Sequence, residues 1–428
     1  MDEGHPRERH HAGLRDDTML ENGPLTGSKV LELGSTISGP FCARLLADFG
    51  AEVIKVEPPE GDTLRSLGHR YDGKSLYAAT LLRNKSLITV NLRENAGREI
   101  VRKLAGKCDI VVENFKPGTL EKWGLGYDDL RALNRGLIMV RISGFGQTGP
   151  YSSRAGYGVV SEAVSGLRHL IGDPDRPPAR VAVALTDYIT GLYAAFGAVM
   201  ALHARRVTGV GQCIDAALNE CAFSFLEAHV PAYEKLGVIA KRAGSRLPNS
   251  SPNNLYPSRD DQHVHITAIA DAVFRRMCAV MGREDLATDA RFAAAIARGA
   301  NSDALDSIIA EWTQTFDARE IEQKLNAADV PATRIFTMAD IFEDPHYLAR
   351  GMLVDVPDDE LGSVKLTAPV PALSGTPGRI RHSGRKIGRD TARILEELLG
   401  LGTEEIDALA LAGAIGSREA APATSGTP

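Results

Sequence analysis

Short apolar runs alternate with helical patterns along the first half of the chain. Residues 29–33 (KVLEL) form a strand-like run, and the glycine turn GSTISGP, the helical stretch FCARLLADFG and a second strand-like run, AEVIKVE, follow in that order. Gly50 stands where a helix C-terminus usually has its C′ glycine. Strand, glycine turn, helix and strand within about thirty residues are typical of a βαβ unit, which predicts the start of a parallel sheet.

The same alternation continues to about residue 218. Further strand-like runs lie at 87–92, 108–113 (CDIVVE), 137–143 (LIMVRIS) and 212–218, with a helical run at 95–107. We therefore predict an α/β fold with a Rossmann-like, doubly wound sheet. In such a fold the ligand crevice lies at the carboxyl ends of the strands.

A single carboxylate interrupts the run at 181–197, VAVALTDYITGLYAAFG, which is otherwise mostly apolar, small or hydroxylic. Apolar residues recur there at three- and four-residue spacing, which predicts a core helix that begins at Thr186 or Asp187. Gly191 and Gly197 each weaken such a helix by about 1 kcal/mol relative to Ala, so they indicate the close approach of another segment. Asp187 is then either a capping carboxylate or a nucleophile held over a cleft.

The second half of the chain has a different texture. Residues 241–257 (KRAGSRLPNSSPNNLYP) read as a long loop, and loops of this length are often functional. One strand (HVHITAIA) and several helices then predict a smaller α+β domain. We predict a disordered tail over 1–24, a large Rossmann-like CoA-binding domain over 25–225, a linker and active-site loop over 226–257, the small domain over 258–350, a return segment with C-terminal helices packed on the large domain over 351–415, and a disordered tail over 416–428.

Composition mainly excludes other classes of protein. With 43% hydrophobic and 24% charged residues, the chain is that of an ordinary soluble globular protein. The formal net charge of −6 gives no sign of a nucleic-acid footprint, and no apolar run approaches the ~20 residues that span a bilayer. The N-terminus lacks the apolar core of a signal peptide. Five scattered cysteines without a CxxC pair indicate neither a disulfide framework nor a zinc site, so we expect a cytoplasmic protein.

Several short motifs remain open to more than one interpretation. The first glycine turn is neither a P-loop nor GxGxxG, although Glu57 ends the second strand where a dinucleotide fold places its ribose-binding acid. The turn NFKPG with Lys116 and Lys122 is either a phosphate site or solvated surface charge. His263 and His265 alternate on one strand, but no third ligand follows at a sensible spacing, so we expect no metal site.

Many sequence blocks occur together in the order and spacing of one enzyme family. They are GPFCARLLADFGAEVIKVEPPEGD, NKSLITVNL, VVENFKPGTLEKWGLGYDDL, RISGFGQTGPY, LTDYITGLYAAFGAVMAL, TGVGQCIDAAL, GSRLPNSSPNNLYP, VPATRIFTMADIFEDPHYLAR and PALSGTPGRI. From about residue 27 to residue 402 the chain resembles class III coenzyme A transferases of the CaiB/BaiF (formyl-CoA transferase) type. It is most similar to the branch of succinyl-CoA:dicarboxylate transferases.

The resemblance implies an interlocked homodimer and places the catalytic aspartate at Asp187. In the family mechanism this carboxylate attacks an acyl-CoA thioester to give an aspartyl-acyl anhydride, and the CoA thiolate then forms an aspartyl-CoA thioester. A carboxylic, here dicarboxylic, acid takes over the CoA. The donor would be succinyl-CoA or a similar thioester, with CoA and acyl-CoA as substrates, no permanently bound cofactor, and no nucleic-acid or membrane partner.

The resemblance also implies contacts for both substrates. The residues matched to CoA contacts are Ile37, Ser38, Gly39, Asn114, Phe115, Lys116, Lys122, Ser143 and Tyr157. Gly244, Ser245 and Arg246 match the loop over the active site. Arg246 is either a bidentate partner for the distal carboxylate of the acid or an ordinary loop-surface arginine.

Acyl-CoA racemases of the same superfamily are the first alternative. Those enzymes place a histidine base in the block that matches RAGYG at 154–158, and Tyr157 takes its position here. A tyrosine with a pKa near 10 is a poor base near neutral pH, which favours acyl transfer. Gly158 also replaces an Asp that is common there. A catalytically silent CoA-binding protein is the second alternative, and Asp187 within its complete motif argues against it.

Overall fold

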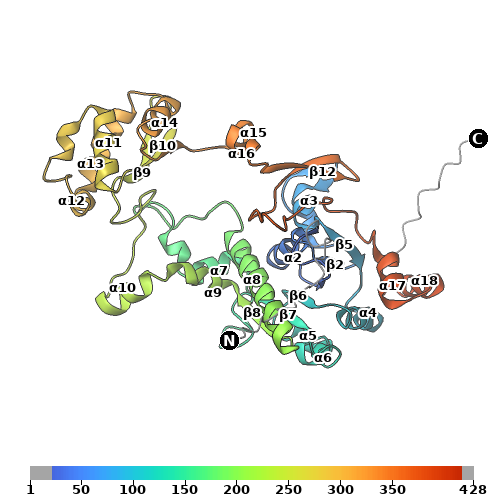
Figure 1. The fold of residues 1–428 in the computed structure, drawn as a ribbon. Coiled ribbons are helices and arrows are strands. Elements are labelled where there is room, and N and C mark those ends of the chain that lie inside the picture. Colours follow the sequence, from blue (N-terminus) through green and yellow to red (C-terminus); the bar gives the residue numbers. More distant parts are fainter. Residues whose placement is uncertain (1–21, 417–428) are drawn as a thin grey trace, which may run out of the picture. The chain divides into compact units, whose positions relative to one another are not determined.

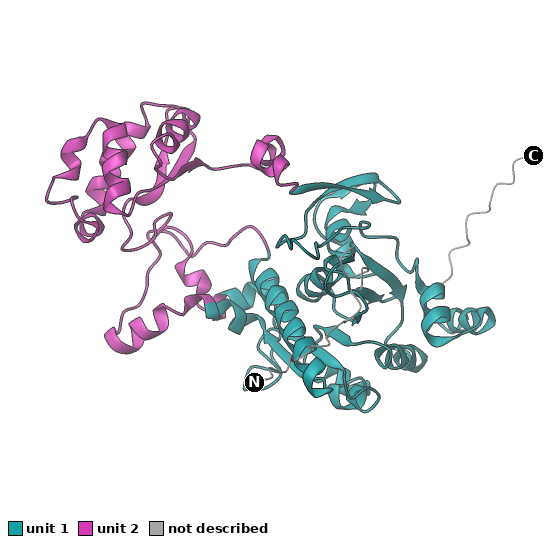
Figure 2. Cartoon of the chain, viewed as in Figure 1, with its two compact units in different colours: residues 1–162, 184–224, 352–428 teal, residues 163–183, 225–351 magenta. Residues whose placement is uncertain are grey.

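The computed structural model describes residues 22–416, so nearly all of the two predicted tails lies outside the described residues. Contacts within the chain divide it into two units, shown in Figure 2. Unit 1 comprises residues 1–162, 184–224 and 352–428, and unit 2 comprises residues 163–183 and 225–351. Residues 163–183 fall within the range 25–225 predicted for the large domain, but their contacts assign them to unit 2. One of these contacts is the hydrogen bond from the Gly244 N–H to the Gly172 carbonyl at 3.1 Å.

A six-stranded parallel sheet forms the centre of unit 1 (Figure 1). Its strands, in spatial order, are β5 (Lys85–Thr89), β2 (Glu52–Glu57), β1 (Lys29–Glu32), β6 (Ile110–Glu113), β7 (Ile138–Ser143) and β8 (Cys213–Ala217). The strand order reverses direction between β1 and β6, which is the switch point where open α/β sheets bind ligands. The predicted α/β fold with a parallel sheet is therefore confirmed.

Helices cover both faces of this sheet, as expected for parallel strands that are apolar on both sides. The helices of unit 1 are α2 (Ser38–Asp48), α3 (Leu76–Leu81), α4 (Asn95–Ala105), α5 (Thr119–Lys122), α6 (Tyr127–Arg131), α7 (Gly158–Val164, at the boundary), α8 (Leu185–Thr208), α9 (Leu218–Phe223), α17 (Thr391–Leu399) and α18 (Thr403–Leu411). Helices α2 and α8 share one core with Val30, Ile110 and Val140 of the sheet. Helices α4 and α17 share the other core with Leu31 and Val111.

The longest of these helices, α8, packs against α2, β7 and β8. Gly191 permits this contact, because a Cβ there would lie 2.8 Å from the Ser38 carbonyl oxygen and from Phe41. The close approach predicted from Gly191 is therefore confirmed. Among the described residues α8 is also the one helix long and apolar enough to cross a membrane, which the sequence had not led us to expect. Its buried face contributes to the core of unit 1, as in a core helix of a soluble protein.

Two small hairpins complete unit 1. They pair β3 (Arg70–Tyr71) with β4 (Lys74–Ser75), and β12 (Leu353–Asp358) with β13 (Gly362–Thr367). A buried ion pair joins the two hairpins, because Lys74 Nζ lies 2.7 Å from Asp358 Oδ2. The return segment is thereby held to the start of α3, far away in the sequence.

Unit 2 contains a three-stranded antiparallel sheet with helices beside it. The strands are β9 (Asn253–Pro257), β10 (His263–Thr267) and β11 (Ala332–Arg334), in the order β11-β10-β9. The helices are α10 (His229–Leu236), α11 (Asp271–Met281), α12 (Ala295–Ala300), α13 (Ser302–Thr313), α14 (Ala318–Asn326), α15 (Met338–Glu343) and α16 (Pro345–Ala349). Tyr256, Ile266, Phe274 and Ile309 belong to its own apolar core.

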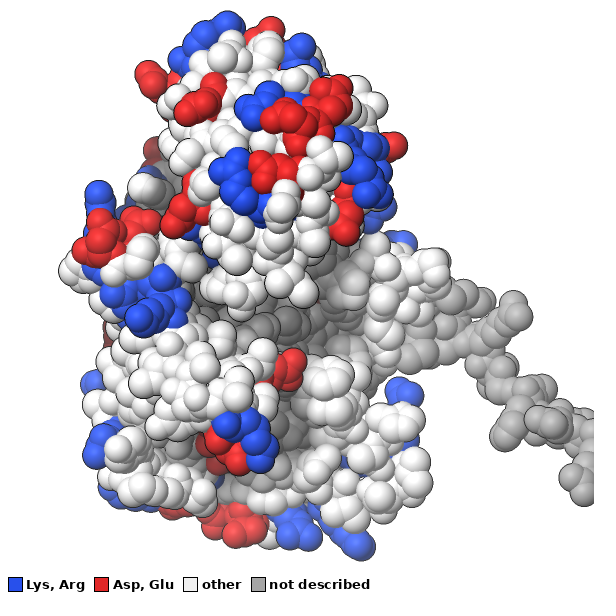
Figure 3. Space-filling model, turned by 90° about the vertical axis from the view of Figure 1, so that its left-hand side faces the viewer, with Lys and Arg blue, Asp and Glu red and all other residues white. Residues whose placement is uncertain are grey.

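Charges of both signs are intermixed on the surface. On the face drawn in Figure 3, Lys and Arg side chains alternate with Asp and Glu, and wide areas carry neither. A large field of one sign is absent from that face, in keeping with the modest net charge of −6. That pattern does not resemble the basic footprint of a nucleic-acid-binding surface.

Candidate active site

Asp187 is the third residue of α8 and half-buried. The helix begins at Leu185, one residue before the predicted start. Residues four apart share a helix face, so Asp187 lies one turn before Gly191 on the face that meets the Ser38 carbonyl. The neighbouring Tyr188 packs edge-to-face on Phe41 with 4.7 Å between ring centres. The structure thus brings the start of α8 to the start of α2.

Gly158 lies against the Asp187 carboxylate, and Tyr77 bonds to Tyr188, the next residue along α8. A Cβ added at Gly158 would collide with Asp187 Oδ2, so a side chain there would force the carboxylate to move from this position. The Tyr77 hydroxyl lies 2.8 Å from the Tyr188 hydroxyl. Burial, the hydrogen bond with Tyr188 and the negative charge of Asp187 all raise the pKa of Tyr77. Tyr77 therefore remains a neutral hydroxyl near Asp187 at physiological pH.

The turn from Gly34 to Pro40 connects β1 to α2 and contains the predicted residues Ile37, Ser38 and Gly39. Ile37 is the N-cap of α2, and Ser38 and Gly39 are its first two residues. Their backbone N–H groups find no acceptor among the described residues, as is usual for the first turn of a helix. Three N–H groups therefore converge at the helix end that α8 approaches.

Asn114 clamps this turn from the next strand. Its Oδ1 accepts a hydrogen bond from the Ser35 N–H at 2.8 Å, and its Nδ2 donates to the Ser35 carbonyl at 2.8 Å. Gly34 and Gly39 make room for the amide, because a Cβ on either would lie 3.2 to 3.4 Å from its side-chain atoms. The Asn114 side chain thus makes its hydrogen bonds to the protein backbone, and we propose that it supports the CoA site by holding this turn.

A cavity of about 350 Å³ opens at the carboxyl ends of β1, β2 and β5. Phe115 lines it and packs edge-to-face on Trp123 with 5.5 Å between ring centres. Ser35, Thr63 and Arg93 line it as well. Apolar rings next to hydroxyl groups and a guanidinium suit a ligand that has an aromatic part and an anionic part.

Four further predicted CoA contacts also lie outside this cavity. Lys116 and Lys122 are exposed, with no ion pair among the described residues. Ser143 is the last residue of β7, and its hydroxyl is buried without a hydrogen-bond partner among the described residues. Tyr157 is 61% exposed just before α7. Of the predicted CoA contacts, therefore, Phe115 alone lines the cavity, and Asn114 bonds to the neighbouring turn that leads to Ile37, Ser38 and Gly39.

The three predicted acceptor-binding residues lie in unit 2. Gly244, Ser245 and Arg246 line a polar pocket of about 600 Å³. Arg246 is already paired there, with Nη1 2.5 Å from Asp303 Oδ1 and Nε 2.7 Å from Asp306 Oδ2. These carboxylates raise the pKa of Arg246 against the effect of burial, so the guanidinium stays charged.

Several residues around the site were not predicted. Tyr77, Trp123 and Arg93 belong to sequence blocks that match the family, yet nothing in their local spacing indicates that they meet Asp187 or Phe115. No group of three or more His, Cys, Asp or Glu in the described part of the chain is placed to hold a metal ion. His265, one of the two alternating histidines, has its Nε2 2.9 Å from Asn253 Oδ1.

A family model described as CoA-transferase family III matches residues 25–391. The chain belongs to CoA-transferase family III. It is 46% identical over 385 residues to succinyl-CoA–D-citramalate CoA-transferase of Chloroflexus aurantiacus, covering 90% of this chain and 96% of that protein. It is 38% identical to succinate–glutarate CoA-transferase of Agrobacterium fabrum, covering 88% of this chain and 96% of that protein. A CaiB/BaiF family protein from Brucella suis has the same fold, with a TM-score of 0.80 at 38% identity, covering 88% of this chain and all of that one.

The predicted family is thereby confirmed, together with its resemblance to the dicarboxylate branch. The chain is a class III CoA transferase, an enzyme whose substrates include CoA thioesters. The names of two relatives contain succinyl-CoA or succinate together with a second acid. The donor and the acceptor of this enzyme are therefore the properties still to be assigned.

Proposed function

We propose that this cytoplasmic enzyme transfers CoA from succinyl-CoA, or a similar thioester, to a dicarboxylic acid through covalent intermediates on Asp187. The names of the relatives support the substrate class, since they use succinyl-CoA or succinate together with citramalate or glutarate. The position of Asp187 supports its role as the nucleophile. It lies in the first turn of α8, where unpaired backbone N–H groups favour the charged form of a carboxylate.

The exchange balances without an outside reagent. The Asp187 carboxylate attacks the thioester carbonyl, the C–S bond breaks, and CoA leaves as a thiolate. The thiolate attacks the aspartyl carbonyl of the anhydride, which releases the donor acid as its carboxylate and leaves an aspartyl-CoA thioester. The acceptor carboxylate attacks that thioester and expels the thiolate again. The thiolate then attacks the acceptor carbonyl, which forms the new acyl-CoA and restores the carboxylate.

The start of α2 supplies the electrostatic part of this proposal. Each attack on a carbonyl develops an oxyanion, which backbone N–H groups stabilise most when they are fixed beforehand. The N–H groups of Ile37, Ser38 and Gly39 lie at the helix end that α8 approaches. We propose that these N–H groups donate hydrogen bonds to the oxyanion and that the neutral Tyr77 hydroxyl is a further donor.

The cavity beside Phe115 receives the nucleotide end of CoA in this proposal. Phe115 and Trp123 offer ring surfaces to the adenine, and Arg93 offers a cation to the phosphates. Lys116 and Lys122 contribute a positive field at the exposed rim of the same loop. Ser143 and Tyr157 stay proposed contacts of the acyl end, on the strength of the family resemblance alone.

Arg246, with Gly244 and Ser245, receives the distal carboxylate of the acid in this proposal. Asp303, its nearest partner, is 89% exposed, and an exposed ion pair is worth at most about 1 kcal/mol. A substrate carboxylate can therefore replace Asp303 on the guanidinium at little cost. Asp306 keeps the other edge of the guanidinium in place.

Trapping the covalent intermediate tests the reaction. The enzyme is incubated with succinyl-CoA, quenched with hydroxylamine or borohydride, digested and examined by mass spectrometry. We expect a modification confined to the peptide that contains Asp187, and none in the Asp187→Asn variant. An unmodified Asp187 across a panel of acyl-CoAs that bind, together with deuterium exchange at an acyl α-carbon, would favour the isomerase. Binding without either signal would favour a silent CoA-binding protein.

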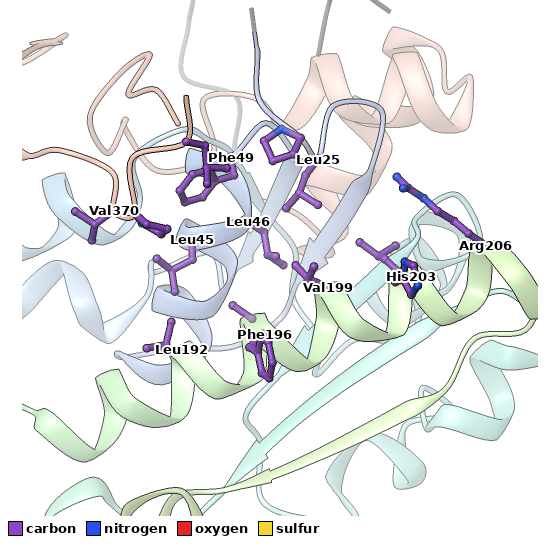
Figure 4. A pocket seen from close by; sticks show the side chains of 15 residues that line it. Leu25, Leu45, Leu46, Phe49, Leu192, Phe196, Val199, His203, Arg206 and Val370 are labelled. Carbon is purple, nitrogen blue, oxygen red and sulfur yellow. The ribbon is translucent and has the colours of Figure 1, made fainter. Parts of the chain in front are cut away.

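We also propose that the enzyme works as an interlocked homodimer. An apolar groove of about 450 Å³ runs along α8 in unit 1, and Figure 4 shows Leu192, Phe196 and Val199 of α8 facing Leu45 and Phe49 across it. Leu192 and Phe196 are each 58% exposed. A contiguous apolar surface of this kind normally marks a protein interface.

Sedimentation velocity tests the assembly. We expect the native enzyme to sediment as a dimer and Phe196→Glu to shift toward the monomer, because a charge on the groove opposes its burial. Leu411→Glu is the matched control, since Leu411 is 90% exposed on α18 and outside the groove. A native monomer that retains full activity would contradict the dimer without touching the assignment of Asp187.

A further inference from the structure

Two fully buried lysines lie beneath the turn from Gly34 to Pro40. Lys55 projects from β2 and Lys85 from β5, and the side chain of each is at most 1% exposed. Lys55 Nζ donates to the Gly34 carbonyl, and Lys85 Nζ donates to the Pro40 carbonyl at 2.8 Å. The two ammonium groups therefore hold the first and the last carbonyl of the same turn.

Two buried carboxylates neutralise these lysines. Glu32 bridges them, with Oε1 3.3 Å from Lys55 Nζ and Oε2 2.6 Å from Lys85 Nζ. Asp62 lies 2.8 Å from Lys55 Nζ and accepts the Thr36 N–H at 3.2 Å. Glu32, Lys55, Lys85 and Asp62 thus form a neutral cluster, which we call the buried quartet.

Stability alone is a poor reason for such a cluster. Burying charges costs several kcal/mol per ion, and apolar side chains of similar volume are often as stable or more so. The quartet, however, contacts the turn at three backbone groups: the Gly34 carbonyl, the Thr36 N–H and the Pro40 carbonyl. Thr36 has a φ of +68°, a left-handed conformation that is unfavourable for threonine and needs such support.

The backbone groups of the turn fall into two sets. The Gly34, Ser35 and Pro40 carbonyls and the Ser35 and Thr36 N–H groups are all bonded to the quartet or to Asn114. The N–H groups of Ile37, Ser38 and Gly39 have no acceptor among the described residues. The Gly34 N–H also has no acceptor among the described residues, but it lies before the bonded groups of the turn. Ile37, Ser38 and Gly39 follow one another at the start of α2, so we consider their three N–H groups for a ligand.

We propose that the buried quartet is a positioning device that fixes the N–H groups of Ile37, Ser38 and Gly39 for the oxyanion formed at Asp187. This inference rests on the proposed function, because it assumes that an oxyanion develops beside this turn. Lys55 and Asp62 also line the cavity beside Phe115, whereas Lys85 does not, so Lys85 is the member whose effect passes through the backbone of the turn. The quartet then affects the rate of the chemical step more than the binding of CoA.

Lys85→Met tests this role, because it keeps the length of the side chain and removes the donor to Pro40. The double variant Glu32→Gln/Lys85→Met also leaves Pro40 without its donor but restores neutrality, since Lys55 and Asp62 then balance each other. Lys74→Met is the matched control. Lys74 is likewise a buried lysine paired with a buried carboxylate, Asp358, but it contacts no part of the turn.

We expect both Lys85 variants to lower kcat and the rate of adduct formation on Asp187 by about 100-fold, as for a misplacement of about 1 Å. The Kd for CoA and KM should change less than threefold. Lys74→Met should lower the melting temperature and leave kcat per folded active site unchanged.

Two results would overturn the positioning role. One is a folded double variant with native kcat, and the other is a double variant that does not fold, which would assign the quartet to stability. A native enzyme that forms no adduct on Asp187 would instead contradict the proposed function, so the two failures are distinguishable.

Discussion

Beneath the turn that begins α2 in unit 1, charged groups are buried and held from several elements, whereas Arg246 in unit 2 pairs with one buried carboxylate, Asp306, and one exposed carboxylate, Asp303. The quartet side chains are at most 1% exposed, while Asp303, which pairs with Arg246, is 89% exposed. Buried, ion-paired groups cannot move without loss of several contacts, but exposed ones exchange partners cheaply. This contrast agrees with the proposed roles, a rigid reaction centre in unit 1 and a pocket for the acceptor acid in unit 2.

The largest effect should come from Asp187 itself. Asp187→Asn keeps the shape of the side chain and removes the nucleophile, so CoA transfer should fall by at least about 10⁴-fold. The Kd for CoA, measured by calorimetry, should stay within a factor of about three. Glu404→Gln, a change at another acidic residue in the first turn of a helix, is the control and should keep full activity. Residual transfer in Asp187→Asn near the native rate would remove the covalent route.

The next effect should come from Gly158, whose missing Cβ leaves room for the carboxylate. Gly158→Ala should lower kcat about 100-fold, because the added methyl displaces Asp187 from its position. Gly375→Ala is the matched control, since nothing lies within 4 Å of its Cβ position. Steady-state kinetics of the three proteins decide the matter, and equal kcat values would show that Asp187 tolerates the shift.

Buried and exposed ion pairs should also differ in stability. Asp358→Asn, which breaks the buried pair with Lys74, should cost about 3 kcal/mol of unfolding free energy at pH 7. Asp317→Asn breaks an exposed pair with Arg259 in unit 2 and should cost less than about 1 kcal/mol. Urea unfolding of both variants checks the difference, and equal costs would contradict it.

Asp358 also makes the free energy of unfolding depend on pH, in a direction that its pKa shift determines. Burial opposes ionisation of Asp358, but hydrogen bonds from Lys74 and Ser383 outweigh it and lower its pKa from 3.8 to about 2. A depressed pKa contributes stability above the unfolded pKa and loses it as the pH falls through the folded one. The native enzyme should therefore lose this contribution, about 2 kcal/mol, between about pH 4 and pH 2, and Asp358→Asn should lack that component in unfolding curves.

The smallest effect should appear at the open pocket of unit 2. Arg246→Gln should raise KM for a dicarboxylic acceptor about tenfold and leave KM for succinyl-CoA unchanged, because only the distal carboxylate of the acid loses its partner. Arg259→Gln is the control, a more exposed arginine of unit 2 that is also paired with two carboxylates. Unchanged acceptor kinetics in Arg246→Gln would leave Arg246 as a loop-surface arginine.

Local patterns were enough to predict the parallel sheet, the helix that carries Asp187 and the close approach at Gly191. Each of these features is encoded within a few neighbouring residues, as a periodicity, a glycine or a charged group in an apolar run. The family blocks identified the family, and they are the basis on which roles for Asp187 and for the turn from Ile37 to Gly39 stay predictions.

Tertiary structure alone decided how these pieces meet. Asn114 bonds to Ser35, 79 residues away, and Lys85 bonds to Pro40, 45 residues away, and no local pattern records either partner. Periodicity tells which face of an element is buried but not which element covers it. The same limit hid the contact of Tyr77 with Tyr188 and the position of Arg246 between two carboxylates, since each depends on where distant backbone segments come together.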